Sequence, residues 1–227
     1  EGTLWVTDSD EIVGIDMATA KVKSKTKVSG AQFLNDTAVG SDGTVYVTDM
    51  AGNKIIALKG GKTSVVAEGE DLEYPNGLLV EGDVLVVGGW GKPKSPTDFT
   101  TDVPGRLFKW DLKTKKKTLI TPEPAANIDG LESDGKGGYI ATDYLAGRVL
   151  HITADGKVTT LTTFMPSTHA LLPAPITYCE SLEPSSPCTI TTVIAWRLFG
   201  SGCQWQWQST WTSSSTWNKR SSGGGSR

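Results

Sequence analysis

A repeat of about 41 residues is the feature of this sequence that most restricts its fold. The tripeptide Val6-Thr7-Asp8 returns 41 residues later as Val47-Thr48-Asp49, and again as Ala141-Thr142-Asp143. The turn Glu1-Gly2-Thr3 returns at the same spacing as Asp42-Gly43-Thr44. A fixed period of roughly 20–50 residues is typical of chains built from stacked, similar units. The sequence therefore predicts an array of units.

A second set of landmarks follows the same period. Asn35 lies 41 residues before Asn76, and Asp129 lies 53 residues after Asn76. Without an insertion of about 12 residues near Gly91–Gly105, the longer interval would also be about 41 residues. The third unit is therefore expected to carry an extra segment.

Each unit contains short runs of alternating apolar residues separated by Gly, Asp and Asn, which is the pattern of β-strands joined by turns. No window shows the i, i+3, i+4, i+7 spacing of an amphipathic helix. Four antiparallel strands in about 40 residues are typical of a β-propeller blade, so the fold is predicted to be all-β. The predicted strands are Thr37–Gly40, Val45–Thr48, Lys54–Leu58 and Thr63–Ala67 in the second unit, and Gly138–Thr142, Arg148–Thr153 and Val158–Thr162 in the fourth.

Residues 1–164 supply about four such blades, and the first unit lacks its first strand. Each blade of a ring buries its two faces against neighbouring blades, so an open stack exposes apolar surface at both ends. The register is therefore interpreted as part of a six-bladed propeller, with material missing at both ends.

The composition changes near residue 165. Residues 1–164 carry a net charge of −5, whereas residues 165–227 carry +2, five of the eight tryptophans and all three cysteines. Low acidity and many Ser and Thr residues predict a poorly ordered tail outside the propeller. Two alternatives are an aromatic carbohydrate-binding patch around Gln204–Trp211 and a continuation created by a shift of reading frame.

Charge and hydropathy exclude two classes of partner. The whole chain has a net charge of −3 and no basic cluster, which argues against nucleic acid. No segment approaches the roughly 20 consecutive apolar residues of a membrane span. The expected partner is a small molecule.

Oxygen-bearing side chains recur where each blade begins. Asn35, Asn76 and Asp129 are predicted to lie on the loops that lead into successive inner strands, at the top face of the propeller. Carboxylate and amide oxygens from several loops suit a hard cation such as Ca²⁺, with Zn²⁺ as the second choice. The alternative is that Asn76-Gly77 and Asp129-Gly130 only supply turn geometry.

Three motifs resemble the inner strands of the SMP-30/gluconolactonase/LRE-like family: Leu34-Asn35-Asp36, Tyr74-Pro75-Asn76-Gly77-Leu78 and Ile128-Asp129-Gly130-Leu131. The resemblance spans residues 1–164. It implies a six-bladed propeller and a metal-dependent hydrolase of a lactone or similar ester. It also implies Asn35, Asn76 and Asp129 as metal ligands.

One ligand of that family has no match in this sequence. The family carries a further glutamate at the start of an earlier blade, but the 41-residue register places Glu1 opposite Asp42, in a turn at the bottom face. The slot for the glutamate would fall before Glu1. Two other interpretations therefore stay open, a non-catalytic NHL-like propeller that binds a protein or small ligand, and an inactive fragment.

The mechanism expected for the hydrolase centres on Asp129. A bound cation would polarise the lactone carbonyl and activate a water, with Asp129 as ligand and candidate general base. No Ser-His-Asp arrangement competes with this assignment, because the two histidines are His151, on a predicted third strand of its blade, and His169, in the tail. His151 is interpreted as a blade-surface residue.

Two further sets of repeated residues are interpreted as structural. Each Asp that ends a second strand is expected to bond its own turn and to pair with a nearby Lys54 or Arg148. The aromatic residues of the second strands are expected to pack between blades. These residues are Asp8, Asp49, Asp143, Trp5, Tyr46 and Tyr139.

Overall fold

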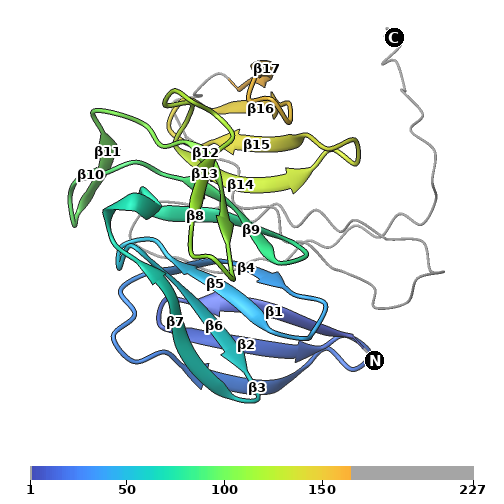
Figure 1. Ribbon diagram of the computed structural model, residues 1–227. Helices are drawn as coiled ribbons and strands as arrows, with labels where there is room; N and C mark the ends of the chain where they lie inside the picture. Colours follow the sequence, from blue (N-terminus) through green and yellow to red (C-terminus); the bar gives the residue numbers. More distant parts are fainter. Residues whose placement is uncertain (1, 165–227) are drawn as a thin grey trace, which may run out of the picture.

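The computed structural model describes residues 2–164, which form successive antiparallel sheets (Figure 1). The 165–227 tail, with the predictions made for it, lies outside the described residues. The second sheet has the order β4-β5-β6-β7 and the fourth the order β14-β15-β16-β17. Their strands are β4 (Leu34–Val39), β5 (Val45–Asp49), β6 (Lys54–Lys59), β7 (Lys62–Glu68), β14 (Ile128–Ser133), β15 (Tyr139–Asp143), β16 (Arg148–Ile152) and β17 (Val158–Thr163).

The other two sheets depart from this plan as the sequence predicts. The first has three strands, so its unit lacks the innermost strand. The third keeps four strands in the same order from the inner strand outward, β8-β9-β12-β13, but its chain is interrupted by an insertion. A two-stranded hairpin, β10–β11, is inserted between β9 and β12. The strands are β1 (Thr3–Asp8), β2 (Glu11–Asp16), β3 (Lys21–Lys27), β8 (Pro75–Glu81), β9 (Val84–Gly89), β10 (Pro93–Ser95), β11 (Asp98–Thr101), β12 (Leu107–Asp111) and β13 (Lys117–Leu119).

The inner strands of successive sheets lie against one another, β4 against β8 and β8 against β14, while β1 contacts β4. This is the packing of propeller blades. The strands predicted for the second and fourth units are confirmed within one residue, except that β4 begins three residues before the predicted Thr37. Apart from a short 3₁₀ turn, η1 (Glu70–Leu72), the described residues contain no helix. Within them, no helix could span a membrane.

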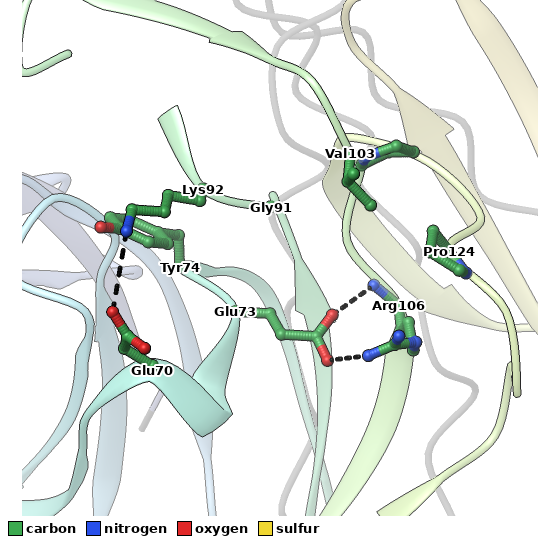
Figure 2. A pocket seen from close by; sticks show the side chains of 9 residues that line it. Glu70, Glu73, Tyr74, Gly91, Lys92, Val103, Arg106 and Pro124 are labelled. Carbon is green, nitrogen blue, oxygen red and sulfur yellow. Dashed lines mark hydrogen bonds and ion pairs between the residues drawn. The ribbon is translucent and has the colours of Figure 1, made fainter. Parts of the chain in front are cut away.

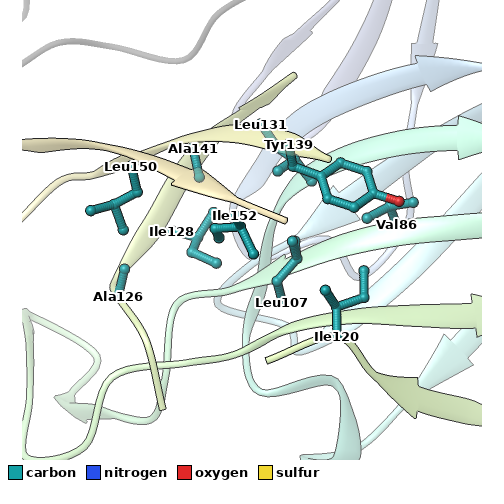
Figure 3. Close-up of a cluster of buried hydrophobic side chains, with 10 residues drawn as sticks. All are labelled: Val86, Leu107, Ile120, Ala126, Ile128, Leu131, Tyr139, Ala141, Leu150 and Ile152. Atoms are coloured by element: carbon teal, nitrogen blue, oxygen red, sulfur yellow. The ribbon is translucent and has the colours of Figure 1, made fainter. Parts of the chain in front are cut away.

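Apolar side chains fill the spaces between adjacent blades in three clusters. The cluster between the third and fourth blades combines Leu107 of β12 with Leu131 of β14 and Leu150 of β16, and none of these side chains is more than 1% exposed (Figure 3). Since strand side chains alternate between two faces, each blade presents one apolar row to each neighbour. Burial between blades therefore accounts for the alternating pattern.

One predicted equivalence is wrong by a single residue. Trp5 and Tyr46 lie two residues before the Thr of their tripeptides, whereas Tyr139 lies three before Thr142. A shift of one residue in a strand moves a side chain to the opposite face. Tyr139 accordingly packs back into the cluster with the third blade, whereas Tyr46 packs forward against that blade. All three aromatic residues pack against apolar clusters, as expected.

The repeated Thr joins neighbouring blades by hydrogen bonds. The Oγ1 atom of Thr48 accepts the N–H of Asp36, 3.0 Å away in its own blade, and donates to the carbonyl of Asn76 in the next, at 2.8 Å. In the first blade, Thr7 donates in the same way to the carbonyl of Asn35. The repeat of this Thr thus reflects a role in satisfying buried backbone groups at blade junctions.

Candidate functional site

The residues predicted as ligands lie inside the inner strands, which corrects their assignment to the preceding loops. Asn35, Asn76 and Asp129 are each the second residue of their strand. The pairing of each inner strand with its neighbour shifts register at this point, between Leu34 and Thr37 in the second blade and at the matching places in the other two. A β-bulge inserts an unpaired residue and re-aims its side chain, so the same bulge presents all three side chains.

The alternative assignment of Asn76-Gly77 and Asp129-Gly130 to turns is wrong. Neither glycine has the positive φ that such turns require. A Cβ at Gly77 would lie 2.9 Å from the carbonyl oxygen of Asp129 and 2.9 Å from the Cβ of Leu131. Gly77 is therefore needed because β8 and β14 approach each other closely.

Asn76 and Asp129 form the centre of the candidate site. Their side chains are 1% and 5% exposed, and the Nδ2 of Asn76 donates to Oδ1 of Asp129 at 3.0 Å. Within residues 2–164 the remaining oxygens, Oδ1 of Asn76 and Oδ2 of Asp129, have no hydrogen-bond partner. Two adjacent buried oxygens without partners leave a desolvation cost that a cation would offset. These two residues fit a metal ligand set.

The third predicted ligand is placed differently. Asn35 is half-buried, and among the described residues no hydrogen bond joins its side chain to Asn76 or Asp129. Its neighbour Asp36 turns toward the next blade, where the carboxylate accepts the N–H of Leu78 at 2.9 Å. The structure thus brings two of the three predicted residues into contact.

Burial raises the pKa of three carboxyl groups on the inner strands. It raises the pKa of Asp36 to about 8, with Asp129 and Glu132 adding like-charge repulsion. The pKa of Asp129 rises to about 7, and that of Glu132 also to about 7. The sequence-based prediction missed Glu132. The repeat contained a signal, because the matching positions of the other two inner strands hold the apolar residues Ala38 and Leu79, and a carboxylate departs from that pattern.

These shifts predict that the metal-free protein loses stability as the pH rises. Each of the three carboxyls has a higher pKa in the folded state, so the folded state holds more protons between about pH 4 and 8. Their stabilising contribution is complete below the unfolded pKa and disappears as the pH rises through 7–8. We expect urea midpoints measured in EDTA to fall from pH 5 to pH 8. Glu132→Gln should lessen that fall, and an unchanged slope would contradict the assignment.

The Asp residues that end the second strands hold loops together. The carboxylate of Asp49 accepts the N–H groups of Gln32 and Phe33, just before the inner strand, and that of Gly52 in its own turn. It also pairs with Lys54, at 3.7 Å. The structural role predicted for these Asp residues is confirmed for Asp49. The sequence did not predict its hydrogen bonds to Gln32 and Phe33.

The fourth blade repeats the arrangement, and His151 has a structural place in it. Asp143 accepts from the N–H of Asn127 at 3.3 Å and pairs with Arg148. His151 lies on β16, where its Nε2 is 2.8 Å from Oδ2 of Asp134, and this contact lowers the pKa of the Asp134 carboxyl. Asp134 follows the end of β14, at the opposite end of the inner strand from Asp129, so His151 is remote from the candidate site.

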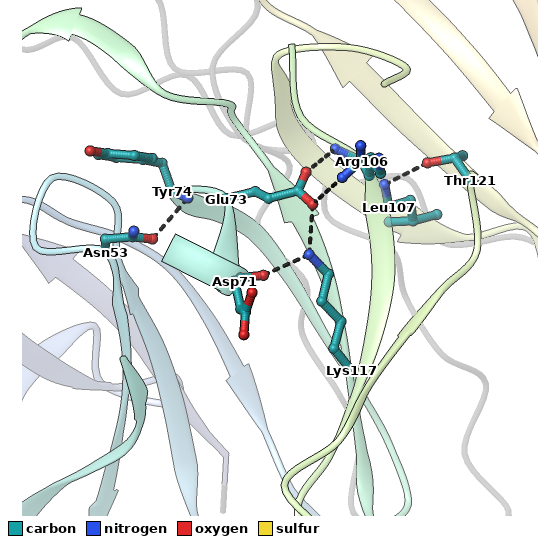
Figure 4. A network of polar contacts seen from close by, with 8 residues as sticks. All are labelled: Asn53, Asp71, Glu73, Tyr74, Arg106, Leu107, Lys117 and Thr121. Atoms are coloured by element: carbon teal, nitrogen blue, oxygen red, sulfur yellow. Dashed lines mark hydrogen bonds and ion pairs between the residues drawn. The ribbon is translucent and has the colours of Figure 1, made fainter. Parts of the chain in front are cut away.

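A strained segment leads into the strand that carries Asn76. Glu73 and Tyr74 both adopt left-handed backbone conformations, with φ of 54° and 57°, which non-glycine residues rarely do. The Glu73 carboxylate is bonded to the backbone and side chain of Arg106, at 3.0 and 2.8 Å, and to Lys117 (Figure 4). The Tyr74 N–H donates to Asn53, at 2.9 Å. These bonds fix the path of the chain into β8.

A cavity of about 250 Å³ lies beside this segment (Figure 2). Its charged groups are paired across it, Glu73 with Arg106 and Glu70 with Lys92. None of Asn35, Asn76 and Asp129 lines it. The cavity is therefore separate from the candidate site.

Comparisons with known proteins support the fold. No family model and no curated protein sequence matches the chain. A nidogen/laminin complex has a chain that matches with a TM-score of 0.62 at 15% identity, over 86% of this chain and 71% of that one. Virginiamycin B lyase from Staphylococcus aureus, with quinupristin, matches with a TM-score of 0.55 at 14% identity, over 77% of this chain. A streptogramin B lyase gives the same TM-score at 17% identity.

The chain spans about half the length, 55%, of each of the two lyase structures. Identities this low are informative about the fold alone. Together with the four successive sheets and their packed inner strands, the matches establish that residues 2–164 form an all-β structure of β-propeller blades.

Proposed function

We propose that the protein is a metal-dependent hydrolase of a lactone or similar ester, of the SMP-30/gluconolactonase/LRE-like kind. The observation that carries the proposal is the pair of buried oxygens without partners, Oδ1 of Asn76 and Oδ2 of Asp129, on adjacent inner strands. The resemblance of the inner-strand motifs supports it independently of this geometry.

Each of the three predicted ligands would have a distinct role in metal binding or proton transfer. Asn76 and Asp129 would hold the divalent cation, preferably Ca²⁺, through these two oxygens, and Asn35 would complete the protein ligands on the neighbouring strand. When bound, the cation supplies positive charge that polarises a carbonyl and lowers the pKa of water. The hydrogen bond from Asn76 Nδ2 fixes the Asp129 carboxylate and leaves Oδ2 as the atom that binds or takes a proton.

A non-catalytic, NHL-like binding propeller is the second candidate. Propellers of similar fold include both a lyase and a chain of the nidogen/laminin complex, and this fold hosts unrelated functions. Binding and hydrolysis must therefore be measured separately.

The test compares the whole chain with and without metal. A ligand that binds only the folded state raises the unfolding temperature, so after EDTA treatment and dialysis, millimolar CaCl₂ or ZnCl₂ should raise it, and MgCl₂ should do so less. Hydrolysis of γ-butyrolactone, followed by pH-stat, should depend on the same metal. A metal-induced shift without hydrolysis would favour the binding propeller, and the absence of a shift with either metal would refute the metal site.

A further inference from the structure

The hairpin β10–β11 departs from the repeat, since β9 and β12 are the only adjacent strands of a described blade that are separated by such an insertion. It projects at the end of the molecule where the inner strands begin (Figure 1). Insertions in repeat proteins often lie on the binding face. The hairpin therefore lies on the same face as the candidate site.

Contacts to three blades hold the hairpin in place. In its own blade, the indole Nε1 of Trp90 donates to the carbonyl of Phe99 at 2.8 Å. From the fourth blade, the Nδ2 of Asn127 donates to Oγ1 of Thr101 at 2.8 Å. Toward the second blade, the ring of Phe99 lies 6.1 Å from the ring of Phe33, tilted by 38°. The hairpin therefore spans the starts of three blades.

Two of these attachment points stand directly before the predicted ligands. Phe33 precedes Asn35 by two residues, and Asn127 precedes Asp129 by two. Two residues of extended chain cover about 7 Å, so the hairpin is anchored within one small-molecule length of the inner-strand bulges.

Two aromatic rings are accessible there, among exposed polar residues of the hairpin. Phe99 keeps 36% of its surface exposed, beside the half-buried Phe33. Trp90 is only 4% exposed and packs with Tyr144, ring centroids 5.4 Å apart, so it supports the hairpin from within. The indole N–H of Trp90 and the Nδ2 of Asn127 are already used to hold the hairpin. We call the accessible pair, Phe33 and Phe99, the aromatic wall.

We propose that the aromatic wall selects lactones or esters that carry an apolar ring or chain over polyhydroxylated sugar lactones. This inference rests on the proposed function for the reaction, but the wall itself is a binding surface. A hydroxyl-rich ligand would lose hydrogen bonds to water against aromatic rings, whereas an apolar substituent gains by leaving water. Phe99 and Phe33 are the specificity-determining residues.

The experiment compares three substrates: γ-butyrolactone, γ-phenyl-γ-butyrolactone and glucono-δ-lactone. The wild-type chain should show the highest kcat/KM for the phenyl lactone. Phe99→Ala and Phe33→Ala should each lower kcat/KM for the phenyl lactone about tenfold and lower the value for γ-butyrolactone much less. Phe99→Leu should restore most of the loss. Phe164→Ala, at an exposed ring after β17, is the control and should change neither value.

Calorimetric titration of the three lactones into Asp129→Asn separates the two proposals, because this variant removes the proposed carboxylate and leaves the wall intact. Tighter binding of the phenyl lactone, weakened by adding Phe99→Ala, would support the wall even if the wild-type chain hydrolyses nothing. A preference for glucono-δ-lactone, or equal losses for all three ligands in Phe99→Ala, would overturn it.

Discussion

Replacing Asp129 by alanine should abolish the stabilisation of the protein by Ca²⁺ and lower lactone hydrolysis by about 10²–10⁴-fold. The physical reason is that Asp129 is the one carboxylate of the proposed ligand set, and its Oδ2 is buried without a hydrogen-bond partner among the described residues. Thermal unfolding with and without CaCl₂, and initial rates by pH-stat, measure the two effects separately.

A matched control distinguishes this result from general loss of structure. Asp155 is an exposed carboxylate in the turn between β16 and β17, where it bonds Thr153. Asp155→Ala should leave the Ca²⁺-induced shift unchanged. The isosteric Asp129→Asn should lose the shift as Asp129→Ala does, while gaining stability at pH 8 in EDTA, because it removes a buried carboxyl whose pKa is raised to about 7. Retention of the full shift in either Asp129 variant would place the metal elsewhere.

Leu107→Ala should have the largest effect on stability of the changes considered, about 2–5 kcal/mol in the free energy of unfolding. The Leu107 side chain is fully buried between the third and fourth blades, where it packs with residues of both. Its removal leaves a cavity at the junction that joins Asn76 to Asp129. Urea unfolding followed by tryptophan fluorescence measures the change.

The control for this variant lies on the neighbouring strand. Leu119 is on β13 and 44% exposed. Leu119→Ala removes the same atoms from a position that keeps contact with water, so it should cost less than about 1 kcal/mol. Equal losses in the two variants would mean that the junction between these blades contributes little to stability.

The spacing of the repeat was sufficient to predict the blades. Turn residues and alternating apolar runs fixed the strands around Val47 and Ala141 because each unit is stabilised by the same burial on two faces. The insertion after β9 followed from the same count. Periodicity therefore carries nearly all the information on the fold.

The parts that the sequence did not predict depend on contacts between units. The bulge at Asn76 lies in the pairing of β8 with β9, and the need for Gly77 comes from the approach of β8 to β14. No local sequence pattern encodes either feature. Tyr139 packs between blades as predicted, but on the opposite face from Tyr46, because it lies one position earlier relative to the repeated Thr. The pairing of Asn76 with Asp129 required the relative positions of two blades.

The threonine bridge between the second and third blades has a consequence for how the candidate site is lost. Thr48 bonds the bulge of one inner strand and the backbone of the next, and Asn76 and Asp129 likewise belong to different blades. A small parting of two blades would thus dismantle the site while every sheet keeps its own hydrogen bonds. On mild heating, binding at the site should accordingly be lost before the circular dichroism signal of the β-sheets. The temperature at which binding is lost would then report how tightly neighbouring blades are joined.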